Sequence, residues 1–363
     1  MNKEVLSDQQ GISIISLFII GSSIVLTTAG AAKKDLWIAI ILSIMTALPI
    51  VFVHSRLLVL FPEKDLYDIL ELIFGKFIGK GFSLLFVWFS FFLGGLVLRV
   101  FGDFIFIVSL PETPKIISMF MIGILCIWGA KEGIETLGRW GEFFLIGTIL
   151  LILLVSLLLI HKMNINNLRP MLSEGIQPLI KGTFHAFIFP FTQTIVFTTF
   201  FSSSHIKSVY KVYILGIFIG GIILYVSSTT DILVLGSTTA GSMYFPTYTT
   251  ARLLKIANLS SGFEIIITTS FLVGGFIKVC MCLLSTCNGV AKIFSCTNYK
   301  FIVTPIGLLI INLSYFIHDN VMDKAEFALD VYPSYALPFQ VILPIIILIS
   351  AEIKKKHLNN HSK

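Results

Sequence analysis

The chain has 363 residues, of which 56% are hydrophobic and only 13% charged, and its mean hydropathy is +0.92. A soluble globular protein carries about 25% charged residues, so this chain lacks the polar side chains needed to cover a water-facing surface. The composition excludes a cytosolic enzyme, a secreted disulfide scaffold and a disordered protein, and it indicates a polytopic membrane protein. The net charge of +6 comes from Lys and Arg scattered between apolar runs, which predicts positive-inside topology and no nucleic-acid partner.

A helix needs about 20 predominantly apolar residues to cross the hydrocarbon core of a bilayer. Such stretches predict ten transmembrane helices, at 9–32, 36–55, 81–110, 116–130, 143–161, 182–206, 212–230, 265–291, 301–318 and 331–351. The charge-free stretch 232–251 is rich in Ser, Thr, Gly and Tyr, which makes it too polar for lipid exposure, and it predicts an ordered external loop. Ten helices with the N-terminus inside place both termini on the inner side, the side that then holds more Lys and Arg.

The whole chain, 1–363, is therefore predicted to be one all-α transmembrane domain. Because the sixth helix starts near the middle of the sequence, the ten helices divide into two five-helix repeats, 9–161 and 179–353. Many secondary transporters with a LeuT-like fold consist of two such inverted repeats, in which the first helix of each repeat is broken at mid-membrane.

Both halves carry helix-breaking residues at corresponding places. Gly21-Ser22-Ser23 lies about halfway along the first helix, where Gly favours unwinding and the hydroxyls can bond freed backbone groups. In the sixth helix, Pro190 leaves the carbonyl of Ala186 without its helical donor. Small residues and prolines also serve packing or kinks in membrane helices, but the matched pair favours a ligand site. Its expected members are Gly21, Ser22, Ser23, Ala186, Pro190, Thr192 and Gln193.

Three charged residues fall inside the predicted helices. Lys278 lies at the centre of the eighth, with 13 uncharged residues on each side, and burying it there costs roughly 2.5–3.5 kcal/mol. We expect its ammonium to take the place of a coupling cation and to bond carbonyls of the broken first helix. A structural ion pair or a lysine lining a water path is the alternative. Arg99 and Asp103 share a face of the third helix at i, i+4, which predicts an intrahelical ion pair or, alternatively, a pair lining the outer vestibule.

The remaining motifs predict neither a metal site nor a cofactor. The cysteines Cys280, Cys282, Cys287 and Cys296 cluster, but their spacing is not that of a zinc site, and we expect small buried hydrophobic residues. No nucleophile elbow, phosphate loop or metalloprotease pattern occurs in the sequence, so no enzymatic activity is expected.

Several motifs, taken in order along the chain, resemble those of one family. Phe61-Pro62-Glu63, followed by FGKFIGK at 74–80, resembles an inner loop of the endospore germination permeases, the B subunits of spore germinant receptors (GerAB/GerKB type). Further matching segments are Asp35-Leu36-Trp37-Ile38, Leu98-Arg99-Val100-Phe101, Leu110-Pro111-Glu112-Thr113-Pro114, Gly133-Ile134-Glu135 with Arg139, Arg169-Pro170-Met171-Leu172 with Gly175, Pro178 and Gly182, and Phe245-Pro246 with Arg252. One departure is Gly262 before Phe263-Glu264, where the family usually has an Arg near a Glu.

The resemblance implies the fold of the amino acid–polyamine–cation transporter superfamily and a place in the inner membrane of a bacterial endospore. It also implies partners, namely an ion-conducting A subunit and a lipoprotein C subunit. Members of the family are thought to sense small germinants, mostly amino acids.

Our main hypothesis is a receptor subunit whose germinant carboxylate meets Gly21, Ser22 and Ser23 at the positive end of a half-helix. The germinant ammonium would meet carbonyls near Ala186 and Pro190, with Thr192 and Gln193 contacting the side chain. The alternatives are a proton-coupled amino-acid permease that carries out net transport, and a structural subunit that binds only its partners.

Overall fold

The computed structural model describes residues 6–201, 206, 208–254, 262–296 and 298–361, and within these ranges every regular element is helical. The α-helices are α1 (Asp8–Ile20), α2 (Leu36–Leu60), α3 (Leu66–Val108), α4 (Lys115–Glu132), α5 (Ile134–Leu158), α6 (Ile176–Ile188), α7 (Val209–Leu235), α8 (Ser237–Ser242), α9 (Pro246–Arg252), α10 (Glu264–Ile293), α11 (Lys300–Phe316), α12 (Val321–Glu326), α13 (Tyr332–Leu337) and α14 (Leu343–His361).

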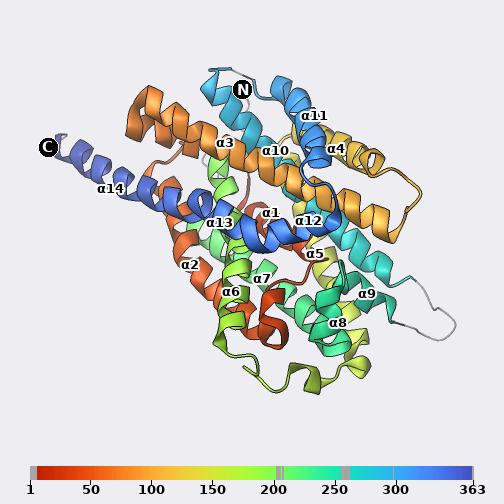
Figure 1. Ribbon diagram of the computed structural model, residues 1–363. Coiled ribbons are helices and arrows are strands. Elements are labelled where there is room, and N and C mark those ends of the chain that lie inside the picture. The colour runs from red at the N-terminus through yellow and green to blue at the C-terminus, as the bar shows by residue number, and fades with distance from the viewer. Residues whose placement is uncertain (1–5, 202–205, 207, 255–261, 297, 362–363) are drawn as a thin grey trace.

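Tighter and wider helical turns interrupt or join these helices. The 3-10 segments are η1 (Gly21–Ser23), η2 (Gly30–Asp35), η3 (Ile160–Lys162), η4 (Ile165–Leu168) and η5 (Phe191–Thr199). Two π-helical segments, η7 (Phe327–Val331) and η8 (Pro338–Ile342), join α12, α13 and α14 into one long continuous helix (Figure 1).

Six helical segments of the described chain are long and apolar enough to cross a membrane, which agrees with an integral membrane protein. They are Gly30–Leu60, Leu66–Val108, Ile134–Leu158, Val209–Leu235, Glu264–Ile293 and Val321–Lys356. The other predicted spans coincide with the shorter helices α1, α4, α6 and α11. Among these, α1 and α6 have only 13 residues each because both are interrupted.

Helix α1 forms the centre of the bundle (Figure 1), and every residue from Ser13 to Ile20 is buried. It packs against α5, α7 and α10. Its contact with α7 is close because Gly216 and Gly220 have no side chain that would collide with Ile15 and Ile19. The Ser16 hydroxyl lies within hydrogen-bond distance of the Gly216 carbonyl, at 3.2 Å.

The two predicted halves of the chain interleave rather than lie side by side. Helix α3 packs along α10, α2 along α7, and α4 along α11, and Figure 1 shows α4 and α11 together at one edge of the bundle. Each of these pairs joins one element from 9–161 to one from 179–353. Any site at the centre is therefore built from both halves of the sequence.

Two predicted loops contain helix. The stretch 56–80 was expected to lie outside the helices, but α2 continues to Leu60 and α3 already begins at Leu66, with a kink at Gly75 (φ 80°). Asp65 starts α3 because its carboxylate accepts a hydrogen bond from the backbone N–H of Asp68 at 2.9 Å. In the predicted external loop 232–251, α7 extends to Leu235 and the short helices α8 and α9 follow.

Both chain ends were predicted to lie on the inner side of the membrane. Residues 1–5 and 362–363, which form these ends, lie outside the described residues.

Candidate functional site

The first helix interruption follows α1, at the residues that the sequence predicted. The α-helix ends at Ile20, and Gly21–Ser23 form the 3-10 turn η1. Ser22 and Ser23 are each 1% exposed, and neither hydroxyl has a hydrogen-bond partner within the described ranges. Buried hydroxyls normally find a partner, so two that lack one at a helix interruption are available to a polar ligand.

The segment after this interruption differs from the prediction. A second half-helix was expected there, with its positive end toward a bound anion. Instead bends and turns continue to Ala29, and the 3-10 segment η2 begins at Gly30. Positive φ angles at Ala29 (59°) and Lys33 (53°) prevent a continuous α-helix. The interruption is therefore faced by the C-terminal end of α1, whose carbonyls favour a cation over an anion.

The second interruption follows α6, also where it was predicted. The α-helix ends at Ile188, Phe189 is extended, and η5 begins at Phe191, directly after Pro190. The carbonyl of the buried Ala186 loses its helical donor because Pro190 has no N–H. The neighbouring carbonyl of Phe187 lies 3.0 Å from the Thr192 hydroxyl.

Lys278 of α10 lies between the two interruptions. Its side chain is fully buried, and its Nζ stands 4.9 Å from the ring centroid of Phe18 on α1 and 4.5 Å from that of Phe189 at the end of α6. A Cβ placed on Gly21 would come within 3.0 Å of Lys278 Cδ. The lysine stem therefore packs on the first interruption, while its charged end is stabilised by two aromatic faces.

The predicted hydrogen bonds from Lys278 to carbonyls of the first helix are not formed. Nζ has no hydrogen-bond partner among the described residues. The packing explains the difference, because the stem runs past Gly21 and carries the ammonium beyond the turn to the phenylalanine rings. A buried ammonium without a hydrogen-bond partner is costly, and a ligand carboxylate or carbonyl would supply that partner.

A polar network fills the other side of the second interruption. Gln193 donates from Nε2 to the Tyr332 hydroxyl at 2.6 Å, and its Oε1 has no partner among the described residues. Thr192 Oγ1 lies 2.6 Å from Gln340 Oε1, and Gln340 Nε2 lies 3.4 Å from the Tyr332 hydroxyl. Gln340 belongs to the π-helical segment η8, and such segments occur frequently at functional sites.

His54 of α2 joins this network from a third side. Its Nε2 donates to the backbone carbonyl of Gln340 at 2.9 Å, so in the neutral ring Nδ1 accepts from the Thr194 hydroxyl at 3.1 Å. The sequence analysis selected Thr192 and Gln193 but missed His54, Tyr332 and Gln340. A lone amide within the apolar run 331–351 was the one sign that could have pointed to Gln340.

Arg99 and Asp103 form the predicted i, i+4 ion pair, with Nε and Oδ1 at 3.3 Å. Two further cations complete it, because Lys115 Nζ lies 3.0 Å from Oδ1 and Lys324 Nζ lies 2.8 Å from Oδ2. Arg99 also donates to the backbone carbonyl of Tyr315 at 2.9 Å. The pair is thus the centre of a buried cluster that joins α3, α4, α11 and α12, which the sequence could not indicate. Whether it lines an outer vestibule stays a prediction.

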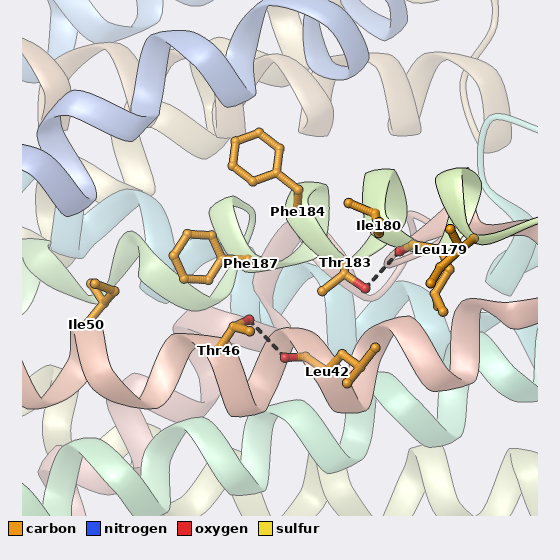
Figure 2. A pocket seen from close by; sticks show the side chains of 9 residues that line it. Leu42, Thr46, Ile50, Leu179, Ile180, Thr183, Phe184 and Phe187 are labelled. Atoms are coloured by element: carbon orange, nitrogen blue, oxygen red, sulfur yellow. Dashed lines mark hydrogen bonds between the residues drawn. The ribbon is translucent and has the colours of Figure 1, made fainter.

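A separate groove of about 460 Å³ lies between α2 and α6, away from the predicted site residues. Figure 2 shows Leu42, Thr46 and Ile50 of α2 facing Leu179, Thr183 and Phe187 of α6. Its hydroxyls are occupied, since Thr46 donates to the Leu42 carbonyl and Thr183 to the Leu179 carbonyl. The groove therefore offers a zwitterionic ligand neither a charged side chain nor a free hydroxyl hydrogen.

The fold is that of a membrane transporter. Over 95% of this chain and 78% of the other, the structure is similar to MHP1, a nucleobase-cation-symport-1 family transporter in a closed conformation with bromovinylhydantoin bound, with a TM-score of 0.71 and 12% identity. It is also similar to a mutant of the Eremococcus coleocola manganese transporter, with a TM-score of 0.58 and 13% identity over 96% of this chain and 85% of the other.

The chain belongs to the spore germination permease family. Residues 5–322 match the family described as spore germination protein, which confirms the resemblance drawn from the motifs. The chain is 28% identical to spore germination protein KB of Bacillus subtilis (strain 168) over 98% of this chain and 97% of that protein. It is 24% identical to the putative spore germination protein YfkT of the same organism over 89% of both chains. It is 27% identical to spore germination protein XB of Bacillus anthracis over 68% of this chain and 69% of that protein.

Proposed function

We propose that this protein is the membrane subunit of a spore nutrient-germinant receptor and that it binds a small germinant between its two helix interruptions. The family supports the receptor role. The observation that carries the binding site is the position of Lys278, whose unpartnered ammonium lies between Phe18 of one interrupted segment and Phe189 of the other.

The germinant is an amino acid, bound with its carboxylate toward Lys278, Ser22 and Ser23. These three side chains are buried and lack hydrogen-bond partners among the described residues, so together they offer one charge and two hydroxyls. The germinant ammonium then meets carbonyls at the C-terminal ends of α1 and α6, including that of Ala186, where a cation is favoured. Gln193 Oε1 is available to the germinant side chain.

Lys278 also takes over the role of a coupling cation in this proposal. Its stem packs on Gly21, and a Cβ on Gly274 would lie 3.0 Å from the Gly21 backbone, so α10 and the first interruption are in direct contact. Germinant binding draws these elements together and shifts the population of a two-state bundle. The shift passes to the A and C subunits in the spore inner membrane. In this proposal ten helices in two inverted repeats build the bundle, which the pairing of α2 with α7, α3 with α10 and α4 with α11 supports.

The first experiment is thermal stabilisation of the purified protein across the twenty amino acids, with Ser22→Trp beside it. We expect one or two amino acids to raise the midpoint of unfolding. Ser22→Trp should abolish this rise, because it replaces a hydroxyl proposed to bind the germinant carboxylate with a bulky indole. Thr269→Trp is the matched control, since Thr269 lies on the exposed face of α10 and should retain the response. A flat result with well-folded wild-type protein would remove the binding proposal and favour a structural subunit.

Two further measurements separate the alternatives. Uptake of the stabilising amino acid into proteoliposomes would identify a permease that carries out net transport, whereas binding without uptake supports a receptor subunit. Spores that carry Ser22→Trp should assemble the receptor but fail to germinate. Normal germination of these spores would exclude a germinant site at this interruption.

A further inference from the structure

Asp231 near the end of α7 is a buried carboxylate without a cationic partner. Its side chain is 1% exposed, and within the described part of the chain no Lys, Arg or His forms an ion pair with it. Oδ2 accepts a hydrogen bond from the Thr247 hydroxyl at 2.6 Å, whereas Oδ1 has no hydrogen-bond partner among the described residues. An uncompensated carboxylate in a protein interior costs several kcal/mol, so this group needs either a proton or a bound cation.

Asp231 lines a small cavity of about 10 Å³ between α5, α7, α9 and α10. This volume is close to the minimum that holds a single water molecule. Apart from Asp231 itself, the polar side chains that line the cavity are hydroxyls, and the remaining lining residues are aliphatic. The hydroxyls belong to Ser156, Ser227, Thr230, Thr247 and Thr250.

Several of these hydroxyl oxygens are free to bind a ligand, because their hydrogens point elsewhere or because they have no partner. Thr247 uses its hydrogen toward Asp231, and Thr250 uses its hydrogen toward the backbone carbonyl of Pro246 at 3.0 Å. Both oxygens therefore keep lone pairs for a ligand. The buried hydroxyl of Ser227 has no hydrogen-bond partner among the described residues. One carboxylate surrounded by neutral oxygens is a donor set for a hard cation.

The charge and size of the cavity restrict which cation fits. A single carboxylate neutralises one positive charge, and a divalent ion would leave a buried net charge that nothing in the lining compensates. Calcium also takes six to eight oxygen ligands, often from several carboxylates, and magnesium keeps several of its waters. A cavity the size of one water accommodates neither hydrated ion. The donor set thus suits a small, dehydrated monovalent cation.

We propose that Asp231, together with the hydroxyls of Ser227, Thr230, Thr247 and Thr250, binds a sodium ion. The ion would join α7 to α9, which lies in the predicted external loop, so that its binding fixes the loop on the bundle. This site is separate from the germinant site around Lys278 and does not depend on the proposed function.

The test is thermal unfolding of the purified full chain in sodium, potassium or choline chloride at constant ionic strength. Sodium should raise the unfolding midpoint by about 3 °C relative to choline, because it binds the folded state alone. Potassium should have a smaller effect because the cavity is small. Asp231→Asn should remove the difference between the salts. The control Asp330→Asn, an exposed residue that pairs with Lys181, should retain it.

A second variant keeps the test decisive if Asp231→Asn does not fold. Ser227→Ala removes a hydroxyl that has no hydrogen-bond partner among the described residues, so the fold should tolerate it. We expect it to raise the sodium concentration for half-maximal stabilisation by about tenfold. Binding of radioactive sodium to the purified protein measures the same affinity directly. Equal midpoints in sodium and choline for the wild type, or an unchanged sodium response in both variants, would overturn the proposal in favour of a protonated carboxyl. An equal response to potassium would overturn the assignment to sodium.

Discussion

Replacement of Lys278 by Met should abolish the response to germinant while leaving the stability of the fold nearly unchanged. Burial of a lysine at the centre of a membrane helix costs about 3 kcal/mol. Each of the two aromatic contacts, at 4.9 and 4.5 Å, contributes up to about 2 kcal/mol when water is excluded. These contributions nearly cancel, and Met fills a similar volume without a charge. We therefore expect the free energy of unfolding of Lys278→Met to lie within about 1 kcal/mol of the wild type.

The assay compares chemical unfolding of the purified proteins with their thermal stabilisation by the germinant. Lys278→Met should unfold as the wild type does but show no germinant-induced shift, and spores that carry it should assemble the receptor without germinating. Lys324→Met is the matched control, because Lys324 pairs with the buried Asp103 and takes no part in the proposed germinant site, so this variant should keep the germinant-induced shift. Asp103 retains Arg99 and Lys115 as partners in it, so the loss of stability should stay below the roughly 3–5 kcal/mol of an uncompensated buried charge.

Two outcomes would refute this reasoning. A germinant response in Lys278→Met equal to that of the wild type would show that the ammonium has no role in binding or signalling. A loss of more than about 3 kcal/mol in Lys278→Met would mean that the lysine is structural, as a broken buried ion pair is.

Two further predictions concern stability alone. Asp103→Asn should lower the free energy of unfolding by about 3–5 kcal/mol, because it leaves three cations without their buried anion. Glu174→Gln, which breaks an exposed ion pair, should lower it by less than about 1 kcal/mol. Equal losses for the two variants in chemical unfolding would contradict the burial argument. In the loop before α3, burial and the neighbouring Asp68 carboxylate raise the pKa of Asp65 to about 6, above about 3.9 in the unfolded chain. Folding therefore favours the protonated carboxyl of Asp65. This adds about 2–3 kcal/mol to the free energy of unfolding below pH 4, and the added stability is lost as the pH rises through 6. Asn can still cap the first turn of α3, so Asp65→Asn should keep the helix while removing this part of the pH dependence of stability between pH 4 and 8. If the unfolding midpoint of the variant depends on pH as that of the wild type does, Asp65 does not titrate as stated.

Much of the architecture could be predicted because it depends on local composition. Apolar runs of membrane length predicted the six long spans, and Gly21 and Pro190 marked the interruptions of α1 and α6. Local patterns failed where the polar and apolar signals are mixed. The segment that begins at Leu66 carries enough charge to be read as a loop, yet it is helical because Asp65 provides its N-cap.

The candidate site was predicted only in part. The sequence identified Ser22 and Gln193, which lie next to helix-breaking residues, but it gave no reason to select Tyr332 or Gln340. Asp231 separated two charge-free stretches and was taken as the boundary between a helix and a loop, although its side chain is buried.

The sequence by itself determined that this is a membrane protein of the spore germination permease family, where its long helices run and where two of them are interrupted. Only the tertiary structure decided that Lys278 lies between the two interruptions, that Asp103 has three cationic partners, and that Asp231 has none among the described residues. The physical reason is that composition and helix-breaking residues act within a few residues of one another. The direction in which a side chain points, and the helix that it meets from a distant part of the sequence, depend on how all the helices pack together.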